Sequence, residues 1–355
     1  MINVTKTYLP PLTDYIGYLE RIWESGWITN NGQFVLELEG ALKNYLGLPY
    51  LQYVANGTVA LQIALKVLNI SGQVITTPFS YVATTTALLW EGCEPVFVDI
   101  EDKTFCIDAD KIEAAITPDT QAILAVHVYG YPCDVLKIQA IAEKYGLKVI
   151  YDGAHAFGVK LNGVSILNYG DLATLSFHAT KIFHTVEGGA IVCGNQEMAE
   201  QIWLRKSFGH RYDDYFTVGI NGKNSELHAA MGLCMLPCMD KLIAERKLIS
   251  DLYDKNLRGS GLITPQRPPD LDYNYGYYPV VFQSEEQLLR VKKALQEQQI
   301  NPRRYFYPAL NLLPYRRGEH CPVAEDISQR VLCMPIYKGL GEEIIQKICN
   351  TLLCY

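Results

Sequence analysis

The chain has 355 residues, of which 49% are hydrophobic and 19% are charged, and its formal net charge is -7. This composition is typical of a globular protein with a large core, and the acidic balance leaves no basic surface for nucleic acid. No apolar run approaches the roughly 18 residues that span a membrane, and the first residues lack the apolar stretch of a secretory signal.

The first two thirds of the chain alternate short apolar strands with amphipathic helices. Residues 51–55 predict a strand, and residues 58–68 predict a helix with Leu61, Leu65 and Leu68 on one face. This alternation predicts an α/β fold, a mostly parallel central sheet with helices on both faces, in which ligands bind beyond the carboxyl ends of the strands. Further strands are expected at 74–77, 95–99, 122–128 and 148–152, and helices at 108–115 and 135–145.

Two groups at predicted strand ends suggest an anion site and a buried charge. Gly57 and Thr58 stand where a strand stops and a helix begins, a junction that binds phosphate, although Asn-Gly is also a common turn. Asp152 ends an apolar strand, so its carboxylate needs a positive partner such as a protonated pyridine nitrogen. The alternative for Asp152 is a helix cap or a turn residue.

Three further residues, in or after predicted strands, could contact the same ligand. His155 could lie against the same ring, or be a satisfied core histidine. Tyr81, in the stretch 77–84, could cover a flat heterocycle with its aromatic face, or anchor its loop to the core. Ser176 stands where it could reach a phosphate.

The most informative residue is Lys181, which a short loop presents between predicted strands at 172–177 and 190–193. An ammonium group loses hydration between buried strands, and this lowers its pKa. The neutral amine is then a nucleophile able to form a Schiff base. For an isolated lysine, the more common arrangement is a stem along the surface with the charge in water.

From about residue 239 the pattern changes. A charged helix is expected at 240–257, a proline-containing loop at 264–274, and strand-and-helix pairs near 278–298 and 331–350. We therefore predict a large cofactor-binding domain at residues 1–238 and a smaller α+β domain at residues 239–355. The chain has no GxGxxG turn and no Walker-type loop, which argues against a dinucleotide or NTP enzyme.

The cysteines and histidines do not suggest a metal. The ten cysteines include no CxxC pair, and the seven histidines form no HxxxH or HxH pair. We expect reduced thiols in a cytoplasmic protein and no metal site.

Together, these segments resemble the DegT/DnrJ/StrS family of pyridoxal-phosphate-dependent sugar aminotransferases, which have fold type I. The resemblance covers nearly the whole chain, from residues 25–32 to residues 334–337. Its most specific passages are 176–181 with 187–189, 152–156 and 127–130.

The resemblance implies a role for each residue of the pattern. Lys181 would bond covalently to pyridoxal 5'-phosphate (PLP) and move the proton, and Asp152 would pair with the pyridine nitrogen. A neighbouring subunit of a homodimer would supply Asn221, although the family motif Gly-Tyr-Asn here reads Gly219-Ile220-Asn221. The remaining implied cofactor contacts are His155 at the ring oxygen, Gly57, Thr58 and Ser176 at the phosphate, and Tyr81 on the ring.

The family also implies the reaction. Its members use nucleotide-linked keto sugars and glutamate, and the lysine favours transamination over dehydration. The closest subgroup aminates C4 of dTDP-4-dehydro-6-deoxyglucose for bacterial surface polysaccharide (O-antigen or lipopolysaccharide). C3 amination, aminocyclitol synthesis, a non-catalytic PLP-binding relative and an α/β oxidoreductase are the alternatives. Candidate substrate contacts, each alternatively a solvated surface group, are Thr29, Asn30, Lys206, His210, Arg211, Lys223 and the pair Arg303 and Arg304.

Overall fold

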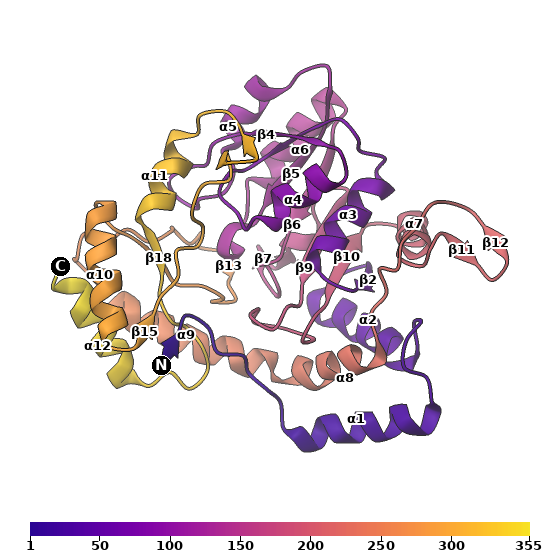
Figure 1. Cartoon of the computed structure of the whole chain (residues 1–355), viewed down its shortest axis with the longest axis horizontal. Helices are drawn as coiled ribbons and strands as arrows, with labels where there is room; N and C mark the ends of the chain where they lie inside the picture. The colour runs from indigo at the N-terminus through magenta and orange to yellow at the C-terminus, as the bar shows by residue number, and fades with distance from the viewer.

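A computed structural model covers residues 1–355 and describes every side chain except that of Arg317. Its centre is a seven-stranded sheet in the order β2-β10-β9-β6-β5-β3-β4 (Figure 1). The strands of this sheet are β2 (Tyr50–Val54), β3 (Gln73–Thr76), β4 (Glu94–Phe97), β5 (Thr120–Val126), β6 (Lys148–Asp152), β9 (Leu172–Ser176) and β10 (Gly189–Cys193).

The sheet is mostly parallel, as the sequence predicts. β3 runs parallel to β4 and β5, and β6 runs parallel to β5 and β9. β10 is antiparallel to β9 and β2, because the chain returns directly after the loop that carries Lys181. The predicted strands of the sheet are confirmed with ends shifted by only a residue or two.

Helices flank both faces of the sheet (Figure 1). The sequence patterns predict the helices near 58–68, 108–115, 135–145 and 240–257 and those of the strand-and-helix pairs near 278–298 and 331–350, but miss the first two helices of the chain and those at Ala83, Gln196, Glu226 and Pro322. The helices are α1 (Leu12–Ser25), α2 (Gln33–Leu46), α3 (Gly57–Val67), α4 (Ala83–Trp90), α5 (Ala109–Ile112), α6 (Val135–Tyr145), α7 (Gln196–Lys206), α8 (Glu226–Met235), α9 (Met239–Asn256), α10 (Glu285–Glu297), α11 (Pro322–Arg330) and α12 (Glu342–Leu353).

Short strand pairs lie outside the central sheet. β1 pairs with β15, β11 with β12, β7 with both β13 and β8, β14 with β18, and β16 with β17. They are β1 (Ile2–Asn3), β7 (Lys160–Leu161), β8 (Val164–Ser165), β11 (His210–Arg211), β12 (Asp214–Tyr215), β13 (Leu271–Asp272), β14 (Pro279–Val281), β15 (Ile300–Asn301), β16 (Leu312–Leu313), β17 (Arg316–Arg317) and β18 (Val331–Cys333).

The sheet buries both of its faces, because side chains along a strand point alternately to opposite sides. In β6, Val149 and Tyr151 belong to one apolar cluster and Ile150 to another. A sheet covered in this way exposes polar groups only at its strand ends, so the site must lie there.

A third apolar cluster, at the left in Figure 1, packs α9, α10 and α12 on β14 and β18. The division at residues 238/239 stays a prediction, because α8 and α9 form one continuous helix, Glu226–Asn256, through a 3-10 turn at Leu236–Cys238. By length and composition this helix could cross a membrane. Half of its most apolar window is buried inside the protein, as in the core helix of a soluble protein, so this is weak evidence.

Candidate active site

The carboxyl ends of the parallel strands open into a cavity of about 700 Å³. Loops after β2, β3, β6 and β9 line it, together with residues from beyond α9. Six of the predicted residues, here called the cavity floor, line it together: Gly57, Thr58, Asp152, His155, Ser176 and Lys181. Tyr81 also lines this cavity.

Lys181 lies on the loop between β9 and β10, and that loop is held by its own backbone. The Lys181 N–H donates to the carbonyl of His178 (2.8 Å), and the Thr185 N–H donates to that of Phe177 (2.9 Å). Burial lowers the pKa of the Lys181 amine, while the charge of Asp152 acts in the opposite direction. The amine is therefore shifted toward its neutral, nucleophilic form.

Asp152 is a buried carboxylate at the end of β6. One oxygen accepts the Thr84 hydroxyl (2.9 Å) and the other accepts the N–H of Ala154 (3.0 Å). Burial raises the pKa of the Asp152 carboxyl, and these two hydrogen bonds and the charge of Lys181 lower it. A cationic ring nitrogen in the cavity would supply further positive charge that this carboxylate can use.

His155 presents a neutral imidazole to the cavity. Its Nδ1 accepts the backbone N–H of Tyr129 (3.1 Å), so the proton of the neutral ring is on Nε2. Burial, helped by the charge of Lys181, holds the pKa of His155 well below its usual range. The ring is stacked on Phe306, with centroids 5.6 Å apart and planes 9° apart.

The N-terminus of α3 provides a place for a phosphate. Asn56 caps this eleven-residue helix by accepting the N–H of Val59 (2.9 Å). A Cβ added at Gly57 would lie 2.9 Å from the Cβ of Ser176, so only glycine keeps this junction open. Open backbone at a helix N-terminus suits an anion, and with the amine and the carboxylate the residues present fit PLP.

Two predicted substrate contacts are engaged elsewhere, which corrects those predictions. Lys206 is buried (1% exposed), where its ammonium donates to Glu39 (2.9 Å) and to the carbonyl of Tyr53 (3.1 Å). Arg304 pairs with Glu285 (2.7 Å) and lies 3.5 Å from the ring centroid of Tyr307. Its neighbour Arg303 lines the cavity instead.

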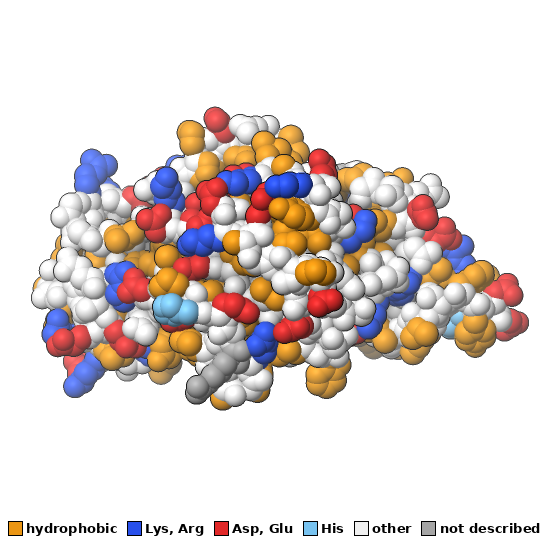
Figure 2. Space-filling model, turned by 90° about the horizontal axis from the view of Figure 1, so that it is seen from above, with side chains coloured by type: hydrophobic (Ala, Val, Ile, Leu, Met, Phe, Trp, Pro, Cys, Tyr) orange, Lys and Arg blue, Asp and Glu red, His pale blue; other side chains and the backbone are white. Residues whose placement is uncertain are grey.

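The other predicted contacts do not line the cavity of their own chain. Four of them belong to the segment 207–223, called here the hairpin segment, which projects at the right in Figure 1. Arg211 pairs with Glu200 (2.7 Å), and Lys223 lies over the ring of Phe208. Apolar side chains are exposed at this end of the molecule (Figure 2), among them Tyr212, Tyr215 and Val218. The contacts concerned are Thr29 and Asn30, before α2, and His210, Arg211, Asn221 and Lys223 in the hairpin segment.

Several residues of the site are not predicted from the sequence. Tyr277 and Tyr305 line the cavity from beyond α9, beside the predicted contact Arg303, and only the richness of 273–278 in tyrosine hints at this. Glu226 is buried, and its carboxylate accepts the N–H groups of Phe34 (2.7 Å) and Val35 (3.0 Å) at the start of α2. It thereby fixes the end of the loop that contains Thr29 and Asn30.

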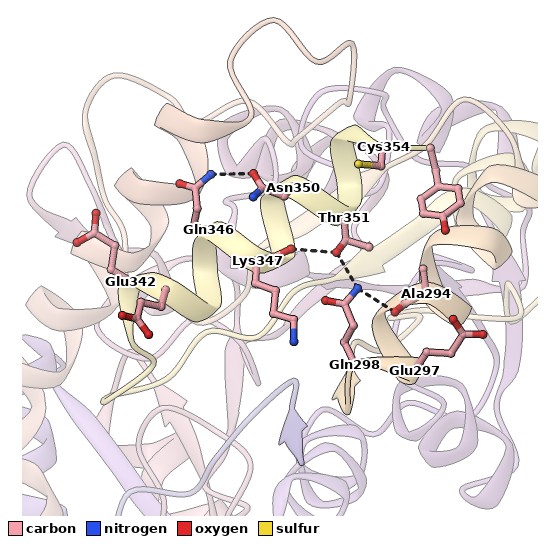
Figure 3. A pocket seen from close by; sticks show the side chains of 11 residues that line it. Ala294, Glu297, Gln298, Glu342, Gln346, Lys347, Asn350, Thr351 and Cys354 are labelled. Atoms are coloured by element: carbon pink, nitrogen blue, oxygen red, sulfur yellow. Dashed lines mark hydrogen bonds between the residues drawn. The ribbon is translucent and has the colours of Figure 1, made fainter.

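A second, more open hollow of about 800 Å³ lies between α10 and α12 (Figure 3). Within it, Gln298 donates to Thr351 (3.0 Å) and to the carbonyl of Ala294 (3.1 Å). None of the predicted site residues lines this hollow. Among the described side chains, no group of three His, Cys, Asp or Glu residues is placed to hold a metal ion.

Comparison with known proteins agrees with this geometry. The family model described as the DegT/DnrJ/EryC1/StrS aminotransferase family matches residues 13–353. A dTDP-4-amino-4,6-dideoxy-D-glucose transaminase of Shigella dysenteriae is 45% identical over 361 residues, and one of Escherichia coli is 43% identical over 368. Both alignments cover 99% of this chain and 98% of the relative.

A solved structure is similar over the same extent. DesI, crystallised in the presence of its TDP-sugar product, superposes with a TM-score of 0.94 at 30% identity, over 99% of this chain and 92% of that chain. The chain therefore belongs to the DegT/DnrJ/EryC1/StrS aminotransferase family, whose members depend on pyridoxal phosphate.

Proposed function

We propose that this enzyme transfers an amino group from L-glutamate to C4 of dTDP-4-dehydro-6-deoxyglucose, giving dTDP-4-amino-4,6-dideoxyglucose. One observation carries the chemistry: the Lys181 amine, the Asp152 carboxylate and the His155 imidazole line one cavity at the carboxyl edge of the sheet. The choice of sugar and carbon is supported by the two relatives that are 45% and 43% identical over nearly the whole chain.

Each floor residue has a physical task in such a reaction. When bound, PLP supplies a ring that accepts the electron pair left when a proton leaves the donor's α-carbon. Asp152 would hold a proton on the ring nitrogen, and the N-terminus of α3 with Ser176 would hold the phosphate. The amine of Lys181 would take the α-proton on Nζ and later give it up, and its depressed pKa favours the neutral form that this requires.

The substrates also constrain the outer part of the cavity. Glutamate carries two carboxylates and the nucleotide sugar a diphosphate, so positive charge is needed near the opening. Arg303 lines the cavity with an exposed side chain, above the ring of Tyr305 (5.0 Å from the centroid). We infer that Arg303, rather than Arg304, meets these anions.

We further propose a homodimer in which a second copy supplies Asn221 and, with it, Thr29, Asn30, His210, Arg211 and Lys223. Two features support this: the apolar side chains of the hairpin segment are exposed, and none of these residues lines the cavity of its own chain. The product would serve surface polysaccharide synthesis in the cytoplasm.

The test of the reaction is incubation of the purified enzyme with glutamate and dTDP-4-dehydro-6-deoxyglucose, followed by NMR of the product. We expect an amino group at C4, and Lys181→Ala should abolish product formation while leaving the fold intact. An amino group at C3, or undiminished turnover by Lys181→Ala, would contradict the proposal.

The test of the shared site is complementation between two inactive variants. A Lys181→Ala subunit still offers Asn221, and an Asn221→Ala subunit still offers Lys181. Random exchange in an equal mixture should therefore restore about a quarter of the native sites. If each chain used its own Asn221, mixing would restore no activity.

A further inference from the structure

Tyr277 is the hydrogen-bond partner that the structure gives to the amine of Lys181. The Lys181 Nζ donates to the Tyr277 hydroxyl at 3.3 Å, across 96 positions of sequence. Tyr277 also lines the cavity, although it comes from the segment between α9 and β14.

The segment that carries Tyr277 is fastened to the cavity floor. The Asn274 side chain donates to the carbonyls of His155 and Phe157, both at 2.9 Å, and accepts the N–H of Gly276 (2.9 Å). These three hydrogen bonds of Asn274 fix the backbone three residues before Tyr277. The hydroxyl therefore has a defined place relative to His155.

The ring of Tyr277 is held as firmly as its backbone. It meets the imidazole of His155 edge-on (centroids 4.8 Å apart, planes at 63°) and lies 5.4 Å from the ring of Tyr129. Phenylalanine would fill this space equally well, so packing alone does not account for the hydroxyl. Burial raises the pKa of Tyr277, so the hydroxyl stays neutral and protonated at ordinary pH and does not compete with Asp152 for positive charge.

We propose that Tyr277 is a positioning residue, whose hydroxyl holds the free amine of Lys181 at the cavity wall whenever that amine is not bonded to the cofactor. The inference rests on the aminotransferase function proposed above. A flexible four-carbon stem otherwise leaves the amine many orientations, and the hydroxyl selects one of them at the edge of His155.

The role predicts a measurable change in the amine itself. By accepting an N–H, the hydroxyl stabilises the ammonium form. Tyr277→Phe should therefore shift the pH midpoint at which the amine becomes reactive downward by about one unit. The amine would also lose its fixed orientation, so capture of PLP above that midpoint should slow about tenfold.

The experiment measures capture of added PLP by the PLP-stripped enzyme, followed by its absorbance across pH. Tyr278→Phe is the matched control, since that hydroxyl bonds Asp254 (2.8 Å) outside the cavity, and its profile should match wild type. Tyr277→His retains a hydrogen-bonding group and should keep the midpoint within half a unit of wild type.

The outcomes separate this role from the function. A wild-type profile in Tyr277→Phe, or the same shift in Tyr278→Phe, would overturn the role of Tyr277 alone. If Tyr277→Phe does not fold, Tyr277→His decides, and a midpoint lowered by a full unit there overturns the role. A stripped wild-type enzyme that captures no PLP would refute the proposed function as well.

Discussion

The cavity floor and the hairpin segment differ in how completely one chain builds them. The floor residues come from three strand ends, those of β2, β6 and β9, yet all of them line one cavity. The hairpin segment carries His210, Arg211 and Asn221 away from that cavity and exposes Tyr212 almost fully. One chain therefore assembles the cavity floor, whereas the predicted cofactor contact Asn221 and the predicted substrate contacts of the hairpin segment depend on what packs against that segment.

The largest expected effect is on the floor. Asp152→Asn should lose the charge at nearly constant size: its one oxygen can still accept the N–H of Ala154, its NH2 group cannot accept the Thr84 hydroxyl, and kcat should fall about a thousandfold. The measurement is steady-state turnover beside a thermal melt. Asp171→Asn is the control, because Asp171 caps the opposite end of β6 (2.8 Å to the N–H of Val149) and should affect stability only. Near-native turnover in Asp152→Asn would show that the reaction does not need the charge of Asp152.

Gly57→Ala tests the space at the N-terminus of α3. The new Cβ would lie 2.9 Å from the Cβ of Ser176, so the junction must shift and PLP should bind roughly a hundredfold more weakly. Titration of the stripped enzyme with PLP measures this. Gly40→Ala, in α2 with no atom within 4 Å of the new Cβ, should leave PLP affinity unchanged. Equal affinity for PLP in both variants would show that the phosphate does not bind at the N-terminus of α3.

The stability of the fold should decrease in acid because of the buried residue His127. His127 is fully buried, and burial lowers its pKa from 6.5 to about 3. Below pH 6.5 this histidine is protonated in the unfolded chain but stays neutral in the native protein. The free energy of unfolding therefore decreases as the pH is lowered, by about 2 kcal/mol at pH 5. Urea unfolding should show this loss, and His127→Asn should reduce it. Tyr151→Phe, which alters the ring stacked on His127, should leave the pH slope unchanged.

The smallest expected effect concerns the opening of the cavity. Arg303→Met should raise the KM for an anionic substrate about tenfold with little change in kcat. Arg304→Met should leave KM unchanged and lower the melting temperature, because Arg304 pairs with Glu285. Separate half-reactions with donor and sugar would tell which anion Arg303 meets, and an unchanged KM for both would exclude the contact.

The sequence predicts the floor well because its information is local. Strand periodicity fixes where β6 and β9 end, and parallel order brings those ends to one edge. Lys206 shows what local information leaves out: its partner Glu39 lies 167 positions away, so nothing nearby distinguishes this lysine from a solvated one. Tyr277 and Tyr305 were missed for the same reason, since long-range packing alone brings them to the cavity.

The continuous helix Glu226–Asn256 links two parts of the molecule. Its first residue clamps the start of α2, beside the loop with Thr29 and Asn30, and its last turns enter the third apolar cluster with Ile249 and Tyr253. A helix of 31 residues is a rod about 46 Å long and stiff along its axis. Arg246 of the same helix donates to the carbonyl of Gly276 (3.4 Å), next to Tyr277, so the loop at one end and the backbone beside Tyr277 are attached to one rod and move together along its axis.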